Sequence, residues 1–178
     1  MSIWKKHSQN GIASIRIEPY LAEYAKNCWG SARRNGAIKI PYTSEFYHLV
    51  YELMAKPSAN AHEWTDTNLD IILPHRTQCE DGVLKNIRYY YYLSPKSALK
   101  IEHWLRRRFN FEFYGIMMDN EMQGRPVSNL EVVRSFIRSH GLESITEDAL
   151  IRSFRRYRHR AYPKKVRKYK KSLKFKKN

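Results

Sequence analysis

Positive charge is concentrated at one end of this chain of 178 residues. Residues 151–178 hold 14 of the 33 Lys and Arg side chains and no Asp or Glu, whereas residues 1–150 hold 19 basic and 17 acidic side chains. Blocks of like charge repel one another and commonly form interaction tails, so the core has to come from the nearly neutral part. Because Trp, Tyr and Phe make up 13% of the chain, that part has enough large apolar groups to fold. We therefore expect a globular body that carries a cationic C-terminal end.

The first half of the chain alternates between strand-like and helix-like patterns. In residues 13–17 and 37–40, apolar side chains alternate with polar or basic ones, and a proline and a helical pattern follow each stretch. A period of two predicts a half-buried strand, and proline suits the first turn of a helix. The predicted elements of this half are strands 13–17, 37–40, 69–74 and 87–93 and helices 19–28 and 43–55. We expect the last two strands to form a hairpin through a loop at 77–86.

A long helical pattern follows the last predicted strand. Ser94 and Pro95 are a typical N-cap and first helical residue, and the pattern runs to about Phe109. The side chains expected to be buried on this helix are Leu99, Ile101, Trp104 and Leu105. Residues 111–118 are apolar and aromatic, and we favour an extension of the helix over a separate strand.

Two capped helices come after a Gly-Arg-Pro linker. Ser128 and Glu131 predict a capping box, in which each side chain accepts a hydrogen bond from the other residue's backbone amide. Gly141 is a typical stop for the first of these helices. Thr146 is a second N-cap, and it predicts a helix over 147–161.

Together these elements predict an α+β fold. Short strands and helices form one small domain, and a C-terminal helical hairpin, similar to a helix-turn-helix, precedes a polybasic tail. The predicted divisions are an α+β body at 1–122, the helical hairpin at 127–162 and a flexible basic tail at 163–178.

Residues 141–150, Gly-Leu-Glu-Ser-Ile-Thr-Glu-Asp-Ala-Leu, carry a resemblance together with the basic run behind them. The chain resembles small uncharacterised basic proteins that prophages and other mobile elements of Bacteroidetes carry. The likeness extends back through residues 92–94 (Tyr-Leu-Ser) and 97–98 (Ser-Ala), so it covers the C-terminal half. It implies a role in a mobile element, and it supplies no activity and no site residues.

The basic side chains of helix 147–161 are expected to gather on one face. At 100° per residue, the basic side holds Arg152, Arg155, Arg156 and His159, and the apolar side holds Leu150, Phe154 and Tyr157. Arg donates two parallel hydrogen bonds to phosphate or guanine, and Lys adds a point charge. We therefore predict a non-catalytic DNA-binding protein, regulatory or accessory to a phage or mobile element. The candidate contact residues are Arg152, Arg155, Arg156, Arg158, Arg160, Lys164, Lys165, Arg167, Lys168, Lys170 and Lys171.

Several alternatives stay open. An RNA-binding accessory protein is one, with tyrosines 89–92 as a platform for unpaired bases, although core packing is the commoner role of such tyrosines. A structural or virion-associated protein is another, with a tail that binds genome or an acidic partner. A metal-dependent nuclease would need Asp70 or Glu80, and the His-x-x-Arg spacing of His103 and Arg106 is too short a match to indicate a recombinase.

Other features of the chain exclude further classes. The seven histidines form no cluster at metal spacing, and Cys28 and Cys79 indicate neither a zinc site nor a disulfide framework. The first residues lack an apolar segment of signal-peptide length, and no apolar run approaches the ~20 residues of a membrane helix. We expect a cytoplasmic protein with no cofactor, no metal, no catalytic residues and no membrane contact, and homodimerisation stays open.

Overall fold

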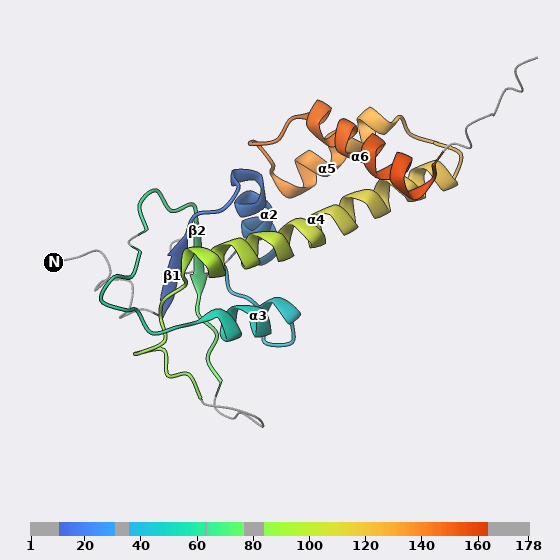
Figure 1. The fold of residues 1–178 in the computed structure, drawn as a ribbon. Coiled ribbons are helices and arrows are strands. Elements are labelled where there is room, and N and C mark those ends of the chain that lie inside the picture. The colour runs from blue at the N-terminus through green and yellow to red at the C-terminus, as the bar shows by residue number, and fades with distance from the viewer. Residues whose placement is uncertain (1–10, 31–35, 63, 77–83, 164–178) are drawn as a thin grey trace, which may run out of the picture.

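The longest helix, α4 (Pro95–Met122), runs through the middle of the molecule and contacts each of the other four helices that the structure describes (Figure 1). The computed structural model describes residues 11–30, 36–62, 64–76 and 84–163. Within these ranges the architecture is mixed α+β, with five helices and one two-stranded antiparallel sheet. The other elements are β1 (Ile12–Ile15), α2 (Pro19–Trp29), α3 (Glu45–Leu53), β2 (Leu69–Ile72), α5 (Asn129–His140) and α6 (Glu147–Ala161).

Helix α4 is long because one apolar stripe continues along most of its length. The stripe is formed by Ile101, Leu105, Phe109, Phe113 and Met117, which recur every four residues and are at most 2% exposed. Ser94 caps the helix by accepting a hydrogen bond from the Ser97 amide. The extension beyond residue 109 is confirmed, and the helix is uninterrupted for 28 residues. The prediction for Leu99 is wrong: it is 65% exposed, because its neighbour Ala98 takes the buried side.

The two strands β1 and β2 pair with each other, and Ile15 lies opposite Leu69 with both side chains fully buried. The strands predicted at 13–17 and 69–74 are therefore confirmed, although β1 starts one residue earlier and both strands end two residues earlier than predicted. Their partnership was not predicted. More than 50 residues separate the two strands, and a local alternation of side chains does not specify which strand pairs with which.

Two predicted strands are wrong. In residues 37–40 only Ile38 makes ladder bridges, to Gly30 and Ile71, so this segment adds one residue to the edge of the sheet. Residues 87–93 do not pair with β2. The Asn86 side chain accepts a hydrogen bond from the Arg88 amide and starts a turn, which stops an extended strand from forming there. The predicted loop at 77–86 lies largely outside the described residues.

One apolar core joins the sheet to all five helices. Its centre is aromatic: the ring of Phe136 in α5 lies 5.4 Å from that of Phe109 and 5.2 Å from that of Phe113, measured between centroids. Tyr24 of α2 adds a ring 5.3 Å from Phe109. These contacts hold α5 on α4 and α2. The predicted division of the chain at residue 122 stays a prediction.

Candidate nucleic-acid interface

Helix α6 has one buried side and one cationic side. The Thr146 side chain accepts a hydrogen bond from the Ala149 amide, which confirms the predicted N-cap. Leu150 and Phe154 are 1% and 2% exposed, so the apolar side lies in the core. The exposed arginines are Arg152, Arg155, Arg156 and Arg160, which we call the arginine face. Burial of one side therefore fixes the direction in which the arginines point.

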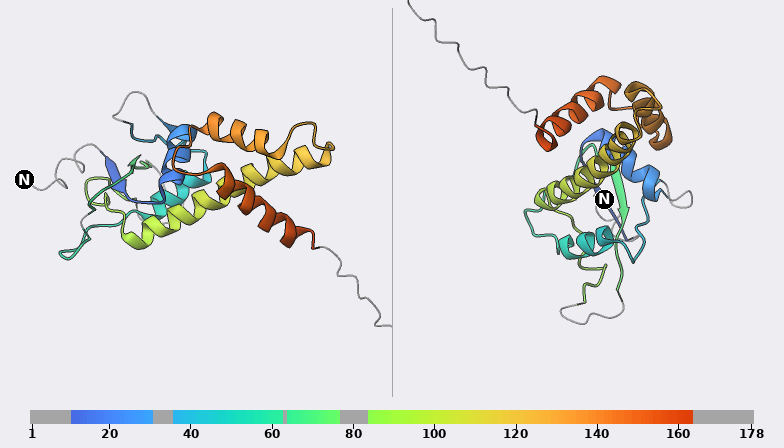
Figure 2. Two further views of the ribbon diagram at one scale, coloured as in Figure 1. Left: turned by 90° about the horizontal axis from the view of Figure 1, so that it is seen from above. Right: turned by 90° about the vertical axis from the view of Figure 1, so that its right-hand side faces the viewer.

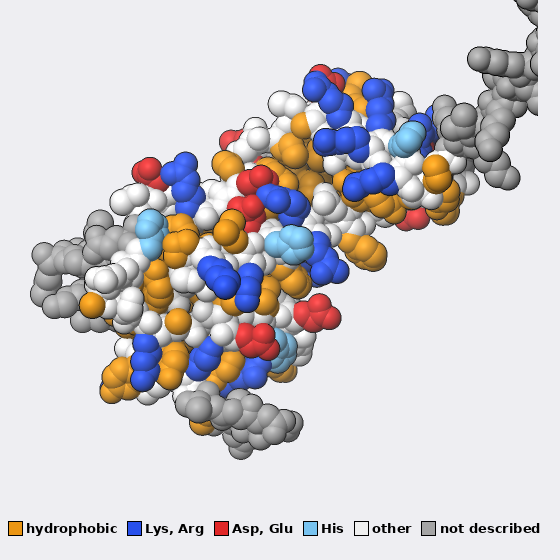
Figure 3. Space-filling view, in the orientation of Figure 1, with side chains coloured by type: hydrophobic (Ala, Val, Ile, Leu, Met, Phe, Trp, Pro, Cys, Tyr) orange, Lys and Arg blue, Asp and Glu red, His pale blue; other side chains and the backbone are white. Residues whose placement is uncertain are grey.

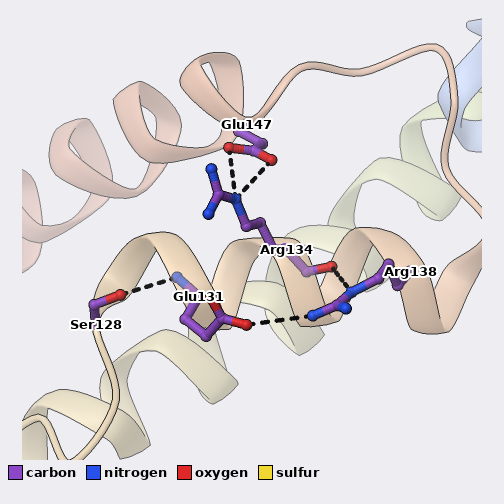
Figure 4. Close-up of polar contacts among 5 residues, drawn as sticks. All are labelled: Ser128, Glu131, Arg134, Arg138 and Glu147. Atoms are coloured by element: carbon purple, nitrogen blue, oxygen red, sulfur yellow. Dashed lines mark hydrogen bonds and ion pairs between the residues drawn. The ribbon is translucent and has the colours of Figure 1, made fainter.

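Helix α5 supports α6 through polar contacts that Figure 4 shows. The Arg134 Nε atom donates to both carboxylate oxygens of Glu147, at 3.0 and 3.2 Å, and so ties α5 to the first turn of α6.

The predicted capping box of α5 forms in one direction only. Ser128 accepts a hydrogen bond from the Glu131 amide at 3.2 Å, whereas the Glu131 carboxylate accepts one from Arg138. The C-terminal stop is confirmed, because the residue after α5 is a glycine in the left-handed conformation.

The connection between α5 and α6 is anchored to the body by Glu23 of α2. Its carboxylate accepts hydrogen bonds from the backbone amides of Glu143 and Ser144, at 2.9 and 3.1 Å, and from the Ser144 hydroxyl. Burial alone raises the pKa of Glu23, but these donors outweigh burial and hold the pKa below its usual value. A carboxylate that is ionised and fully engaged keeps this connection in place.

Helix α6 also packs against α4. The rings of Tyr114 and Tyr157 stack with centroids 4.3 Å apart, and the Tyr114 hydroxyl lies 2.7 Å from that of Ser153. Arg158 reaches Glu121 at the end of α4 with a distance of 2.7 Å. Arg158 is therefore a half-buried packing residue as well as a candidate contact residue, which helical periodicity could not reveal.

The arginine face is free of close carboxylates apart from one. Arg152 lies 3.9 Å from Asp148, and in the part of the chain that the structure describes, Arg155, Arg156 and Arg160 have no acidic side chain within 4.0 Å. A shallow recess of about 520 Å³ is lined by Arg152, Arg155 and Arg156 together with Ala149. Figure 3 shows Lys and Arg side chains gathered over α6. Three guanidinium groups around one recess suit an anion such as phosphate.

The remaining candidates lie outside the described residues. They are Lys164, Lys165, Arg167, Lys168, Lys170 and Lys171. Helix α4 contributes residues to this surface that no pattern in the sequence indicated. Asn110 and Tyr114 line a second recess of about 520 Å³ with Arg156, His159 and Arg160. The four-residue spacing of Asn110 and Tyr114 signals a shared side of the helix, but it does not say which element lies against that side.

The ion pairs of Glu121 give a test of how α6 is held. Burial alone raises the pKa of the Glu121 carboxyl, but Arg158 and Arg125 outweigh it and hold the pKa below its usual value. A carboxyl with a lowered folded pKa stabilises the fold above its unfolded pKa, and this stabilisation is lost as the pH falls through the folded value. We expect Glu121→Gln to lower the free energy of unfolding near pH 7 by about 1 kcal/mol.

The measurement is urea unfolding of both proteins near pH 7 and about pH 3. The difference between wild type and Glu121→Gln should shrink at the lower pH, and a difference that is the same at both would contradict the ion-pair explanation. Glu131→Gln is the matched control. That carboxylate is 51% exposed and pairs with Arg138 at 3.3 Å, so we expect a change within about 0.5 kcal/mol.

The four-tyrosine run does not form a strand that could serve as a stacking platform for RNA. Tyr92 is 7% exposed and bridges to Ala55, whereas Tyr89 is 61% exposed in a turn. Among the described residues, no three His, Cys, Asp or Glu side chains gather as metal ligands would. No described helix has both the length and the apolar character to cross a membrane.

The chain was compared with protein families, curated proteins and solved structures. No family model, curated protein or solved structure matches the chain. The chemistry of the described residues therefore carries any functional assignment.

Proposed function

We propose that the protein binds nucleic acid without catalysis, and that its ligand is DNA in preference to RNA. The arginine face of α6 contacts phosphates, and the lysines between 164 and 177 add affinity. One observation carries the proposal: several exposed arginines point from a helix whose opposite side, Leu150 and Phe154, is fixed in the core. Because the helix backbone is fixed, several guanidinium groups are presented on the same side and can contact neighbouring phosphates of a polyanion together.

We further propose that α5 and α6 act as a helix-turn-helix-like hairpin. The two helices pack on each other, six residues connect them, and Arg134 pairs with Glu147 across them. A recognition helix reads bases mainly with its N-terminal residues. The first turn of α6 carries Glu147 and Asp148, and its arginines begin only at Arg152. This order favours phosphate contacts over base readout, so we expect weak sequence preference.

The resemblance to basic proteins of prophages and mobile elements supports a biological setting for this activity. We propose a regulatory or accessory role in such an element. A preference for duplex DNA over duplex RNA is part of the proposal, because a helix enters the wide major groove of DNA, whereas the major groove of RNA is too narrow for it.

The salt dependence of binding tests the proposal. We compare the full chain with a chain that ends at Pro163, which keeps α6 and removes nine of the Lys and Arg residues. If about six of these contact phosphates, the slope of log K against log salt should become shallower by about five. The truncated chain should keep weaker binding through the arginine face. Full-length protein with no affinity for DNA at about 0.05 M salt would refute the proposal, and so would an unchanged slope.

A further inference from the structure

Helix α6 lies across the long helix α4 (Figure 2). Residues of α4, together with Tyr157 and Tyr162, line an open groove. Its volume is about 750 Å³. The stacked rings of Tyr114 and Tyr157 form part of its wall. We call it the α4–α6 groove and define it by Arg107, Phe111, Tyr114, Gly115, Tyr157 and Tyr162. No motif in the sequence indicated it, because its two sides lie about 40–50 residues apart in the chain.

Large apolar side chains of the groove face solvent. Phe111 is 83% exposed, Met122 is 72% exposed and Tyr162 is 59% exposed, and all three line it. Single exposed apolar residues are ordinary on protein surfaces, but a group of them in one hollow marks a binding site. Figure 3 shows hydrophobic and basic side chains mixed along the face that α4 and α6 form.

Gly115 leaves the backbone of α4 uncovered inside the groove. A Cβ atom added at this position would meet nothing within 4 Å, so packing within the described protein does not require glycine there. Glycine inside a helix costs roughly 0.5–1 kcal/mol relative to alanine. A ligand that approaches the helix closely gives a reason for this residue. Phe111 lies one turn earlier on the same side of α4 and flanks that approach.

The groove is continuous with the arginine face, and its own charged lining is two arginines and two carboxylates. Arg107 and Arg108 line it, and no acidic side chain among the described residues lies within 4.0 Å of either. Asn110 and Tyr114 are shared with the recess of Arg156 and Arg160. Two carboxylates, from Glu45 and Asp119, also line the groove. A nucleic-acid strand whose phosphates are bound on α6 would therefore continue into the α4–α6 groove, where aromatic rings are exposed.

We propose that the α4–α6 groove binds a single-stranded segment of nucleic acid. Unpaired bases stack on Phe111 and Tyr162, while the backbone follows the arginines of both helices. Every base has a face that stacks on an aromatic ring, but a duplex hides these faces between its base pairs. Exposed rings in a groove that adjoins the arginine face therefore favour a single strand over a duplex. This inference rests on the proposed function and adds a second ligand form: an unpaired strand in the groove, besides the duplex bound by the arginine face.

The experiment measures fluorescence anisotropy of full-length protein with an oligothymidine of about 20 nucleotides and with a duplex of equal length. Phe111→Ala removes the ring, Phe111→Leu keeps an apolar side chain without a π-face, and Phe111→Trp keeps the π-face. We expect Ala and Leu to weaken single-strand binding about tenfold and duplex binding less than about twofold. We expect Trp to bind the single strand as wild type does.

Two further variants test the groove without disturbing the core. Gly115→Glu places a negative charge in open space, and we expect about tenfold weaker single-strand binding or more. Gly115→Ala adds only a Cβ atom where the ligand approaches the helix, and we expect a smaller loss of about threefold. Leu99→Ala is the matched apolar control, because Leu99 is 65% exposed on the same helix and does not line the groove. It should leave both affinities unchanged.

The outcomes separate this inference from the proposed function. Wild-type protein that binds neither ligand refutes both. A second outcome overturns the groove assignment alone. In it, duplex binding depends on the arginine face, and the variants of Phe111 and Gly115 change the affinity for neither the duplex nor the single strand. Equal losses on both ligands overturn the preference for a single strand. If Phe111→Ala abolishes self-association in sedimentation and changes neither affinity, the groove binds protein and the inference is wrong.

Discussion

Reversing two charges together, Arg155→Glu with Arg156→Glu, is expected to weaken binding to duplex DNA about 100-fold or more at about 0.1 M salt. Each arginine is exposed and has no carboxylate within 4.0 Å among the described residues, so both are available to phosphate. A hydrogen bond to a charged group contributes about 1.5–3 kcal/mol, and two such bonds account for the loss. Repulsion between the new carboxylates and phosphate adds to it. Anisotropy titrations with one labelled duplex measure the effect.

The control for this double variant changes the net charge by the same amount elsewhere. Lys96→Glu with Arg88→Glu alters two exposed side chains, one in the first turn of α4 and one in the turn after Asn86. If general electrostatic attraction were responsible, both double variants would lose affinity equally, and the arginine face would have no special role. Unfolding temperatures of both should stay close to wild type, since the changed side chains lie outside the core.

Truncation of Phe113 is expected to give the largest loss of stability, about 3–5 kcal/mol for Phe113→Ala. The side chain is fully buried on α4, and its ring centroid lies 5.2 Å from that of Phe136 on α5 and 6.3 Å from that of Phe109. Removing it leaves a cavity where α5 packs on α4, and the long helix limits how far the surroundings can close. Urea unfolding followed by circular dichroism gives the change in free energy.

Phe111→Ala is the matched control, two residues earlier on the same helix. Phe111 is 83% exposed, so its loss should change the free energy of unfolding by less than about 0.5 kcal/mol. Similar losses in the two variants would mean that Phe113 does not hold α5 on α4. The same measurement is the folding control for the binding experiments, because it shows whether Phe111→Ala is folded.

Local hydrogen bonding explains which elements were predictable from the sequence. The caps at Ser94 and Thr146 and the stop at Gly141 lie where their residue types predict them, and helices α2, α5 and α6 have bounds within about two residues of those expected. Each of these signals acts over three or four residues. The separation of basic and apolar sides on α6 is equally local, since it depends on helical periodicity alone.

Such local signals do not specify the chain topology. The pairing of Ile15 with Leu69, the exposure of Leu99 and the turn at Asn86 all depend on contacts that a local pattern does not encode. Alternation of side chains predicts a strand, but the identity of its partner depends on which apolar surfaces the whole chain can bury together. For that reason both strands of the sheet were expected and their pairing was not.

The same distinction between local and long-range information applies to the candidate site. The sequence by itself determined the arginines of α6, their common side and the cationic segment behind them, because charge and helical period are properties of neighbouring residues. Only the tertiary structure decided that Arg158 pairs with Glu121 and that Tyr114 stacks on Tyr157. It also decided that α4 and α6 enclose a groove with Phe111 at its edge. These features bring together side chains about 40 residues apart, and burial of the common core is what sets their distance.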